Sequence, residues 1–222
     1  MTMDTAALHA AWTEAWRELG ADAPGALLPE LMARYGEPQR HYHTLQHLGE
    51  CLALLALHRA AAERPAEVAL ALWFHDAIYD VQGHDNEALS AGWARDVLGA
   101  AGLPAEVAER VHALVMATQH NAVPEGRDAE LLIDIDLSIL GAAPARFAQY
   151  EHQIRAEYAH IPPAVFEPRR RGILSRFIER RPLYQTAAIR AAREAQARIN
   201  LQAAIDSTFS RSPAADAGDA RP

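Results

Sequence analysis

The chain is poor in cysteine and in long hydrophobic runs. Its 222 residues include one cysteine, Cys51, so an internal disulfide cannot form, and we expect this thiol to be a small core residue. The longest apolar runs, Leu52–Leu57 and Val68–Phe74, are far shorter than the ~20 residues that span a bilayer. The N-terminus lacks a basic region followed by an apolar core, so we expect no signal peptide, no membrane partner and a cytoplasmic protein.

The chain also has no excess of basic residues. Lys and Arg total 21 against 29 Asp and Glu, which gives a net charge of -8 at pH 7. Proteins that bind nucleic-acid backbones are normally basic, so we expect no nucleic-acid polymer as a partner. Because 50% of the residues are hydrophobic, the chain can bury one sizeable core, and we expect a single domain over residues 1–207. Residues 208–222 are small and polar and are predicted to be a disordered tail. The sequence leaves the oligomeric state open.

Hydrophobic spacing predicts helix after helix. Leu8, Trp12, Trp16 and Leu19 recur at helical spacing, and Thr44 is a plausible N-cap for the helix through Cys51. A further helix is expected to begin at Pro65 and to reach Tyr79. No hairpin signal is present, so the predicted class is all-α.

The segment Leu132–Leu137 is ambiguous. Apolar and acidic residues alternate there, as in a strand, but a lone strand would have no partner, so we predict a helix. Residues two apart on a helix point about 200° from each other. Asp134 and Asp136 therefore cannot both face one site.

Three polar segments carry the candidate chemistry. They are HYHTLQH (41–47), HD (75–76) and DIDLS (134–138). His75 and Asp76 follow an apolar helical run, where a buried polar pair is costly unless it is hydrogen-bonded or binds a metal. Two imidazoles with two carboxylates form a mixed nitrogen and oxygen set, which favours a divalent transition metal (Mn, Fe, Co, Ni or Zn) over Mg.

This order of residues resembles the HD-domain superfamily of metal-dependent phosphohydrolases. The resemblance covers residues 40–141, the expected motif core, and is strongest to a bacterial branch of predicted HD phosphohydrolases. The shared wording is RHYHTLQH, FHDAIYD, DNEALSA and DIDLSILG, and it continues into ILSRFIERRPLYQT and ARINL near the C-terminus. The resemblance implies an HD-type helical bundle with additional N- and C-terminal helices. A more distant likeness links the chain to cyclic-nucleotide phosphodiesterases.

The resemblance also implies roles for individual residues. His47 corresponds to the first metal ligand of the superfamily, His75 and Asp76 to the defining pair, and Asp136 to the last carboxylate ligand. His43 corresponds to the general acid of the phosphodiesterases. Where those enzymes place a further histidine of a two-metal site, this chain has Tyr79, so one ion is expected and a second is left open.

Three further residues are candidates for substrate contact. Arg40 precedes the histidine segment, where a guanidinium can clamp a phosphate, and we group it with His43 and Asp76 as catalytic. His120, at the end of a predicted helix, is expected to contact substrate or a metal ligand. Arg171 belongs to a basic run over residues 169–181, which is either a solvated face or a positive lip for an anionic substrate.

These features predict a metal-dependent phosphohydrolase. The expected substrate is a small phosphorylated metabolite, with nucleotides ranked first, attacked at phosphorus by a water that the ion activates. Phosphomonoesters rank above phosphodiesters because the sequence shows no evident second metal. Two alternatives stay open: a non-catalytic sensor that binds a phosphorylated ligand, and an HD-type oxygenase that uses two irons.

Overall fold

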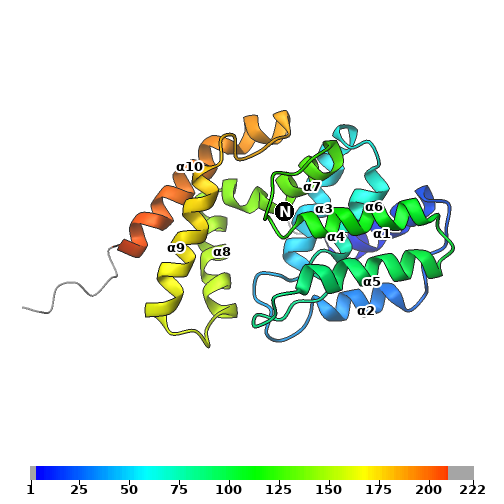
Figure 1. Cartoon of the computed structure of the whole chain (residues 1–222), viewed down its shortest axis with the longest axis horizontal. Helices are drawn as coiled ribbons and strands as arrows, with labels where there is room; N and C mark the ends of the chain where they lie inside the picture. Colours follow the sequence, from blue (N-terminus) through cyan, green and yellow to red (C-terminus); the bar gives the residue numbers. More distant parts are fainter. Residues whose placement is uncertain (1–3, 210–222) are drawn as a thin grey trace, which may run out of the picture.

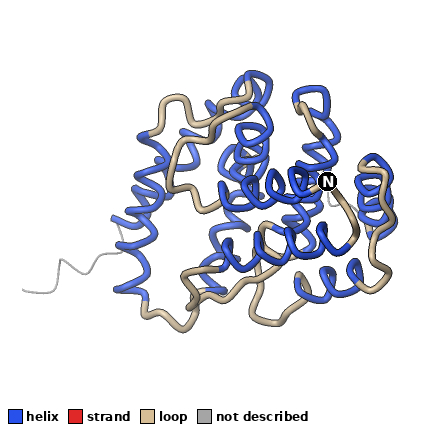
Figure 2. Tube along the Cα trace, turned by 45° about the vertical axis from the view of Figure 1, so that its right-hand side comes forward, coloured by secondary structure: helices blue, strands red, loops and turns tan. Residues whose placement is uncertain are grey.

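The computed structural model describes residues 4–209, which fold into helices joined by short loops, with no strand among them (Figures 1 and 2). The all-α prediction is confirmed. Over the same residues, no helix is both long and apolar enough to cross a membrane. The α-helices are α1 (Thr5–Glu18), α2 (Leu27–Arg34), α3 (Leu45–His58), α4 (Pro65–Phe74), α5 (Asn86–Ala100), α6 (Ala105–Ala117), α7 (Arg127–Asp136), α8 (Pro144–Glu157), α9 (Pro163–Glu179) and α10 (Ala187–Phe209).

Helix α4 lies at the centre of the N-terminal helices. Every residue from Ala66 to Phe74 is buried, and the helix packs against α1, α3, α5, α6 and α7. A helix that is apolar on all sides is stable only when neighbours cover each side. The one charge in this stretch, Glu67, is neutralised by two contacts with the Arg110 guanidinium, at 2.6 and 2.7 Å.

Helix α4 ends earlier than the sequence predicts. It stops at Phe74 rather than Tyr79, so His75 and Asp76 lie in the turn that follows it. Carbonyl groups at the end of a helix lack partners within the helix, and here a side chain supplies one: Tyr35 Oη donates to Trp73 O at 3.1 Å. The helix therefore places the His-Asp pair at the edge of the core.

The segment that alternates apolar and acidic residues is helical, as predicted. Helix α7 ends at Asp136, and a 3₁₀ turn, η2 (Leu137–Gly141), continues the chain. Asp134 is buried, and its carboxylate accepts the backbone N–H groups of Gln185 and Thr186, just before α10. The two aspartates thus serve different parts of the fold.

Helices α8, α9 and α10 lie together on one side of the molecule in Figure 1. Helix α10 packs on α9 and on η2, where Asn200 Nδ2 donates to the carbonyls of Leu140 and Ala142, at 2.8 Å each. Helix α10 runs to Phe209, beyond the expected domain end at residue 207. The rest of the expected tail, residues 210–222, lies outside the described part of the chain.

Candidate metal centre

His43 and His47 are positioned by the start of α3. Thr44 is its N-cap, as predicted, and the Thr44 side chain accepts the backbone N–H of Gln46 at 3.3 Å. His47 therefore falls in the first turn and is 2% exposed. His43 precedes the cap, with its ring centroid 6.0 Å from that of His47.

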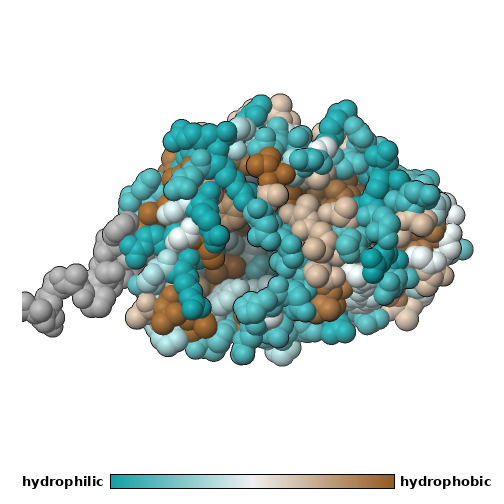
Figure 3. All heavy atoms as spheres, viewed as in Figure 1, coloured by the Kyte–Doolittle hydropathy of each residue, from teal (hydrophilic) through white to brown (hydrophobic). Residues whose placement is uncertain are grey.

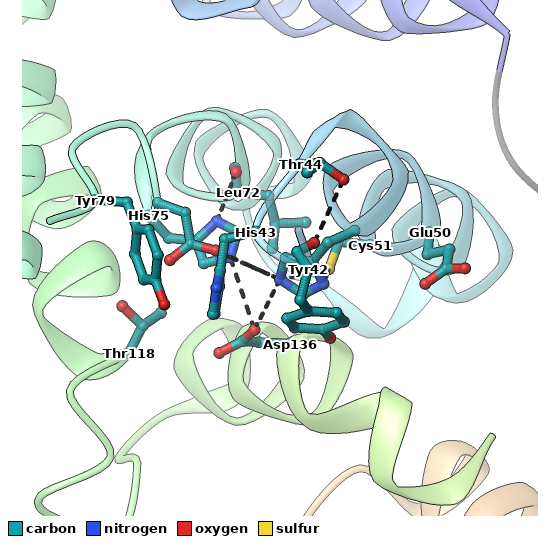
Figure 4. A network of polar contacts seen from close by, with 12 residues as sticks. Tyr42, His43, Thr44, Glu50, Cys51, Leu72, His75, Tyr79, Thr118 and Asp136 are labelled. Carbon is teal, nitrogen blue, oxygen red and sulfur yellow. Dashed lines mark hydrogen bonds and ion pairs between the residues drawn. The ribbon is translucent and has the colours of Figure 1, made fainter. Parts of the chain in front are cut away.

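Four side-chain atoms converge from α3, α7 and the turn after α4. The Nε2 atoms of His47 and His75 are 3.1 Å apart. Asp136 Oδ1 lies 3.2 Å from His47 Nε2 and 3.7 Å from His75 Nε2, and Figure 4 shows His75 and Asp136 pointing toward each other. Asp76 Oδ2 lies 3.0 Å from His75 Nε2 and 3.6 Å from His47 Nε2. Ligands about 2.1 Å from one ion are separated by about 3.0–3.5 Å, so this spacing fits a single ion.

The hydrogen bonds around these atoms also fit metal coordination. His75 Nδ1 donates to Leu72 O at 2.8 Å, so Nε2 of the neutral ring presents a lone pair to the centre. Cys51 Sγ lies 3.7 Å from Nδ1 and 3.8 Å from Nε2 of His47, and Nε2 is the nitrogen that approaches His75 and Asp136. Asp76 Oδ2 is buried, and its near neighbours are the Nε2 atoms of His75 and His47. A buried carboxylate is costly without positive charge beside it, and a cation at the centre supplies that charge.

The electrostatics favour positive charge at this position. Burial raises the pKa of Asp76, but the nearby charges of His75 and His43 outweigh it and hold this pKa below its ordinary value. Burial lowers the pKa of His75, but the Asp76 charge and a hydrogen bond to Asp136 raise it well above its ordinary value. The two ionised carboxylates thus favour a proton on His75, and a divalent cation can take the place of that positive charge.

Within residues 4–209, one group of side chains has the geometry to hold a metal ion: His47, His75 and Asp136. Asp76 adds the fourth atom at the distances given above. All four sequence-predicted ligands are thus brought together.

His43 lies beside this cluster and is held by a glutamate from α8. Its ring is placed between Tyr42, at 4.9 Å between ring centroids, and Tyr79, at 4.2 Å. His43 Nδ1 donates to Glu157 Oε2 at 2.8 Å, so Nε2 is the ring nitrogen left for a ligand in the cavity. Burial lowers the pKa of His43, but the Asp76 charge and the Glu157 hydrogen bond raise it above its ordinary value.

Glu157 is the functional candidate that the sequence does not reveal. Its side chain is 0% exposed, and Oε1 accepts the backbone N–H groups of His41, Tyr42 and His43, at 2.7–3.0 Å. Its Oε2 accepts from His43 and from Tyr79 Oη. Burial raises the pKa of Glu157, but the hydrogen bond and charge of His43 lower it to about 2. No motif surrounds Glu157 in the sequence.

Arg40, which the sequence predicts to clamp a phosphate, is bonded inside the fold. Its side chain is 0% exposed, and its nitrogens donate to the carbonyls of His43, Asp76 and Ala77 and to Glu37. The guanidinium thus joins the histidine segment to the turn after α4. Its charge and hydrogen bonds are used inside the protein, which leaves it no face toward the cavity.

His120 lies against the metal cluster, as one of its predicted roles requires. His120 Nε2 is 3.1 Å from Asp136 Oδ2, the oxygen that does not face the other histidines. The backbone of His120 has a positive φ of 56°, and its carbonyl accepts from Arg180 at 2.9 Å. Burial raises the pKa of Asp136, but hydrogen bonds from His120 and His47 hold it well below its ordinary value.

The cluster opens into a cavity of about 570 Å³ between the N-terminal and C-terminal helices, where the surface in Figure 3 is hollowed. This volume suits a small-molecule ligand. His75, Asp76 and Asp136 lie on one wall. The opposite wall comes from α8 and α9 and includes Tyr150, Tyr158, Phe166, Ile173 and Phe177.

The basic run over residues 169–181 contributes to the cavity wall through α9. Arg169 and Arg170 are among the residues that line the cavity, and Arg171 is not. Contact between Arg171 and substrate stays a prediction.

The chain was also compared with known proteins, and no protein family, curated protein or solved structure matches it.

Proposed function

We propose that this protein is a metal-dependent phosphohydrolase of the HD type that acts on a small phosphorylated metabolite, with nucleotides as the first candidates. The observation that carries this proposal is the placement of four metal-ligand atoms on the wall of a ligand-sized cavity, next to a histidine held by a buried glutamate. Each part has a role in phosphoryl transfer.

The residues that would hold the ion are His47, His75, Asp76 and Asp136. Their mixed nitrogen and oxygen donors favour Mn, Fe, Co, Ni or Zn. When bound, such an ion lowers the pKa of a coordinated water toward neutrality and polarises a phosphoryl oxygen. His120 supports this set from outside, because its contact with Asp136 Oδ2 keeps Oδ1 turned toward the two histidines.

His43 is the general acid in this proposal. Glu157 fixes its ring through Nδ1 and, by its charge, favours the protonated form, so Nε2–H faces the cavity as a proton donor. A leaving alkoxide placed at that nitrogen takes the proton as its bond to phosphorus breaks. Tyr42 and Tyr79 on either side prevent the ring from turning away.

The first test measures metal and phosphate release on the same sample. Purified protein is analysed for metal per chain. It is then assayed for phosphate release from panels of phosphomonoesters and nucleoside di- and triphosphates, and for release of the alcohol and the monoester from phosphodiesters. One ion per chain with phosphate release from monoesters is the expected result. Hydrolysis of diesters alone would reverse the ranking of the two ester classes.

Other outcomes would replace the proposal. Two irons per chain with oxidation of a substrate would support an oxygenase. A metal-loaded protein that binds phosphorylated ligands but releases phosphate from no compound in the panel would be a sensor. In the sensor case His43→Ala would leave ligand affinity unchanged, whereas in the hydrolase it would lower turnover.

A further inference from the structure

Helix α9 presents a row of apolar side chains to the cavity. Phe166, Ile173 and Phe177 all line it, and we call these three residues the apolar row. Residues seven and eleven positions after Phe166 lie within about 20° of it around a helix, so the apolar row occupies one face of α9. None of the three is fully buried: Ile173 is 37% exposed, and the two phenylalanines are half-buried. The apolar row therefore keeps surface that the protein itself does not cover.

The two phenylalanine rings of the apolar row are supported by arginines. The guanidinium carbon of Arg155 lies 4.7 Å from the centre of the Phe166 ring, and this arginine donates to two nearby carbonyls. Arg180 holds the same position beside Phe177, at 5.0 Å, and donates to His120 O at 2.9 Å. Because each arginine is bonded to the backbone, each ring has a fixed support. The apolar row is therefore formed before a ligand binds.

The apolar row begins at the metal centre. The ring centroids of Phe177 and His120 are 5.9 Å apart, and His120 Nε2 lies 3.1 Å from Asp136 Oδ2. Phe166 precedes Phe177 by eleven residues on α9, which is about 16 Å along the helix axis. A ligand with its phosphate at the metal centre therefore meets Phe177 first and Phe166 last.

The arginines next to the apolar row leave it available to an apolar group. Arg169 also lines the cavity, but it is exposed, so its charge can stay in water. Arg170 is buried and pairs with Glu151. A hydrocarbon group can therefore displace water from the apolar row while both charges keep their partners or their hydration.

We propose that the apolar row selects substrates in which the phosphate is attached to an apolar group, such as an alkyl chain. Placement of the phosphate at the metal centre rests on the proposed function. The apolar group lies along Phe177, Ile173 and Phe166, in that order. The substrate class within that function is therefore a phosphate ester of an apolar alcohol, and nucleotides, with their polar ribose, become the comparison class.

Binding of alkylphosphonates tests the apolar row without turnover, because their carbon–phosphorus bond replaces the ester bond that a phosphohydrolase breaks. Wild-type protein loaded with Mn²⁺ is titrated calorimetrically with ethyl-, butyl-, hexyl- and octylphosphonate. Burial of one methylene group raises affinity about threefold, so the dissociation constant should fall about tenfold at each step until the chain passes Phe166. Pentylphosphonate should bind about tenfold more tightly than 4-hydroxybutylphosphonate, a chain of equal length that ends in a hydroxyl.

Substitutions along α9 test the order of contacts. Phe177→Ala should weaken butyl-, hexyl- and octylphosphonate about tenfold, whereas Phe166→Ala should weaken only the longest chains. Val165→Ala is the matched control, because Val165 is 41% exposed on the same helix and is not among the residues that line the cavity. The control should keep the full dependence on chain length.

Ile173→Ser covers the case in which loss of a phenylalanine ring unfolds the protein. Because Ile173 is already exposed, the substitution should leave the melting temperature unchanged. It should weaken hexylphosphonate about tenfold and leave ethylphosphonate, which is too short to reach Ile173, unchanged.

Two results would overturn the apolar row as the determinant of specificity. One is equal affinity for every chain length, including the case in which no phosphonate binds; phosphate release from esters would then leave the hydrolase standing. The other is a dependence on chain length that Ile173→Ser and Phe166→Ala both leave intact, which would place the chain against another part of the cavity. A dependence on chain length in a protein that releases no phosphate would instead overturn the hydrolase and support the apolar row.

Discussion

The N-terminal helices α1–α7 and the C-terminal helices α8–α10 contribute different chemistry to one cavity. All four metal-ligand atoms come from the first region, at the ends of α4 and α7 and the start of α3. The second region supplies Glu157, which holds His43, and the aromatic and basic wall of α9. The candidate metal ligands and the wall built by α8 and α9 thus come from separate parts of the chain.

The buried charges in the two regions are also used differently. Arg40, in the first region, donates to the backbone carbonyls of His43, Asp76 and Ala77. These hydrogen bonds hold the histidine segment against the turn after α4. Arg170, in the second, pairs with Glu151 and packs on the Tyr150 ring. An arginine bonded to carbonyls fixes the backbone of a turn, whereas one paired with a carboxylate joins two helices. The predictions below test this division.

The largest effect is expected from Asp76→Ala, which removes one ligand atom from the first region. Metal affinity should fall by at least about 100-fold and phosphate release should fall to background, while circular dichroism stays helical. Metal per chain after dialysis measures the loss. Asp134→Ala is the control, since this carboxylate binds backbone N–H groups before α10 and should leave metal content unchanged. Normal metal retention by Asp76→Ala would show that the ligand assignment is wrong.

Arg40→Met tests whether this arginine is structural. It leaves the carbonyls of His43, Asp76 and Ala77 without these donors in a buried site, so we expect a loss of about 3 kcal/mol in the free energy of unfolding. Arg198→Met is the counterpart in the second region. Arg198 also donates to backbone carbonyls but is 24% exposed, so water replaces part of its contribution and the loss should be about 1 kcal/mol.

Urea denaturation of the metal-free proteins measures both losses. The reverse outcome for Arg40→Met, unchanged stability with weaker substrate binding, would restore its predicted role as a phosphate clamp.

Glu157→Gln breaks the contact between the two regions at His43. The amide can still accept the backbone N–H groups, but its NH₂ no longer accepts from His43 Nδ1–H, so the ring loses its orientation and its charge partner. We expect turnover to fall about 100-fold with metal content unchanged. Glu50→Gln also removes a carboxylate that joins the regions, through Arg146, and should lower stability without this loss of turnover. Equal effects on turnover would mean that Glu157 acts only through the fold.

The same division explains what the sequence could predict. Helix starts follow from caps and helical spacing, which are local properties, and the helical state of the Leu132–Leu137 segment follows from the lack of a partner strand. The choice of Asp136 over Asp134 rests on the resemblance of the DLS wording to the cyclic-nucleotide phosphodiesterases. Glu157 reaches His43 across 114 residues, and no local pattern encodes that contact. Proximity to histidines in the sequence predicts a substrate contact for Arg40, but the direction of a guanidinium depends on carbonyls that only the folded turn presents. Which arginines of the run over residues 169–181 line the cavity depends on how α9 is rotated about its own axis.

The smallest effect is a shift in the pH dependence of turnover. Because Asp76 and Glu157 raise the pKa of His43 above its ordinary ~6.5, a general acid at this position keeps its proton to a higher pH than a free imidazole does. Turnover should therefore fall on the alkaline side. Glu157→Gln removes a negative charge, so the pKa of His43 drops and the alkaline fall should move about one unit toward acid.

Profiles of kcat against pH, measured with an alkyl phosphate, show this shift. An aryl phosphate with an acidic leaving group is the control, because that group departs without a proton and its profile should lack the His43 limb. His43→Ala should remove the alkaline limb for the alkyl substrate and reduce turnover of the aryl substrate far less. An alkaline limb that stays in place in Glu157→Gln would separate His43 from the carboxylate of α8, and the two regions would then act independently.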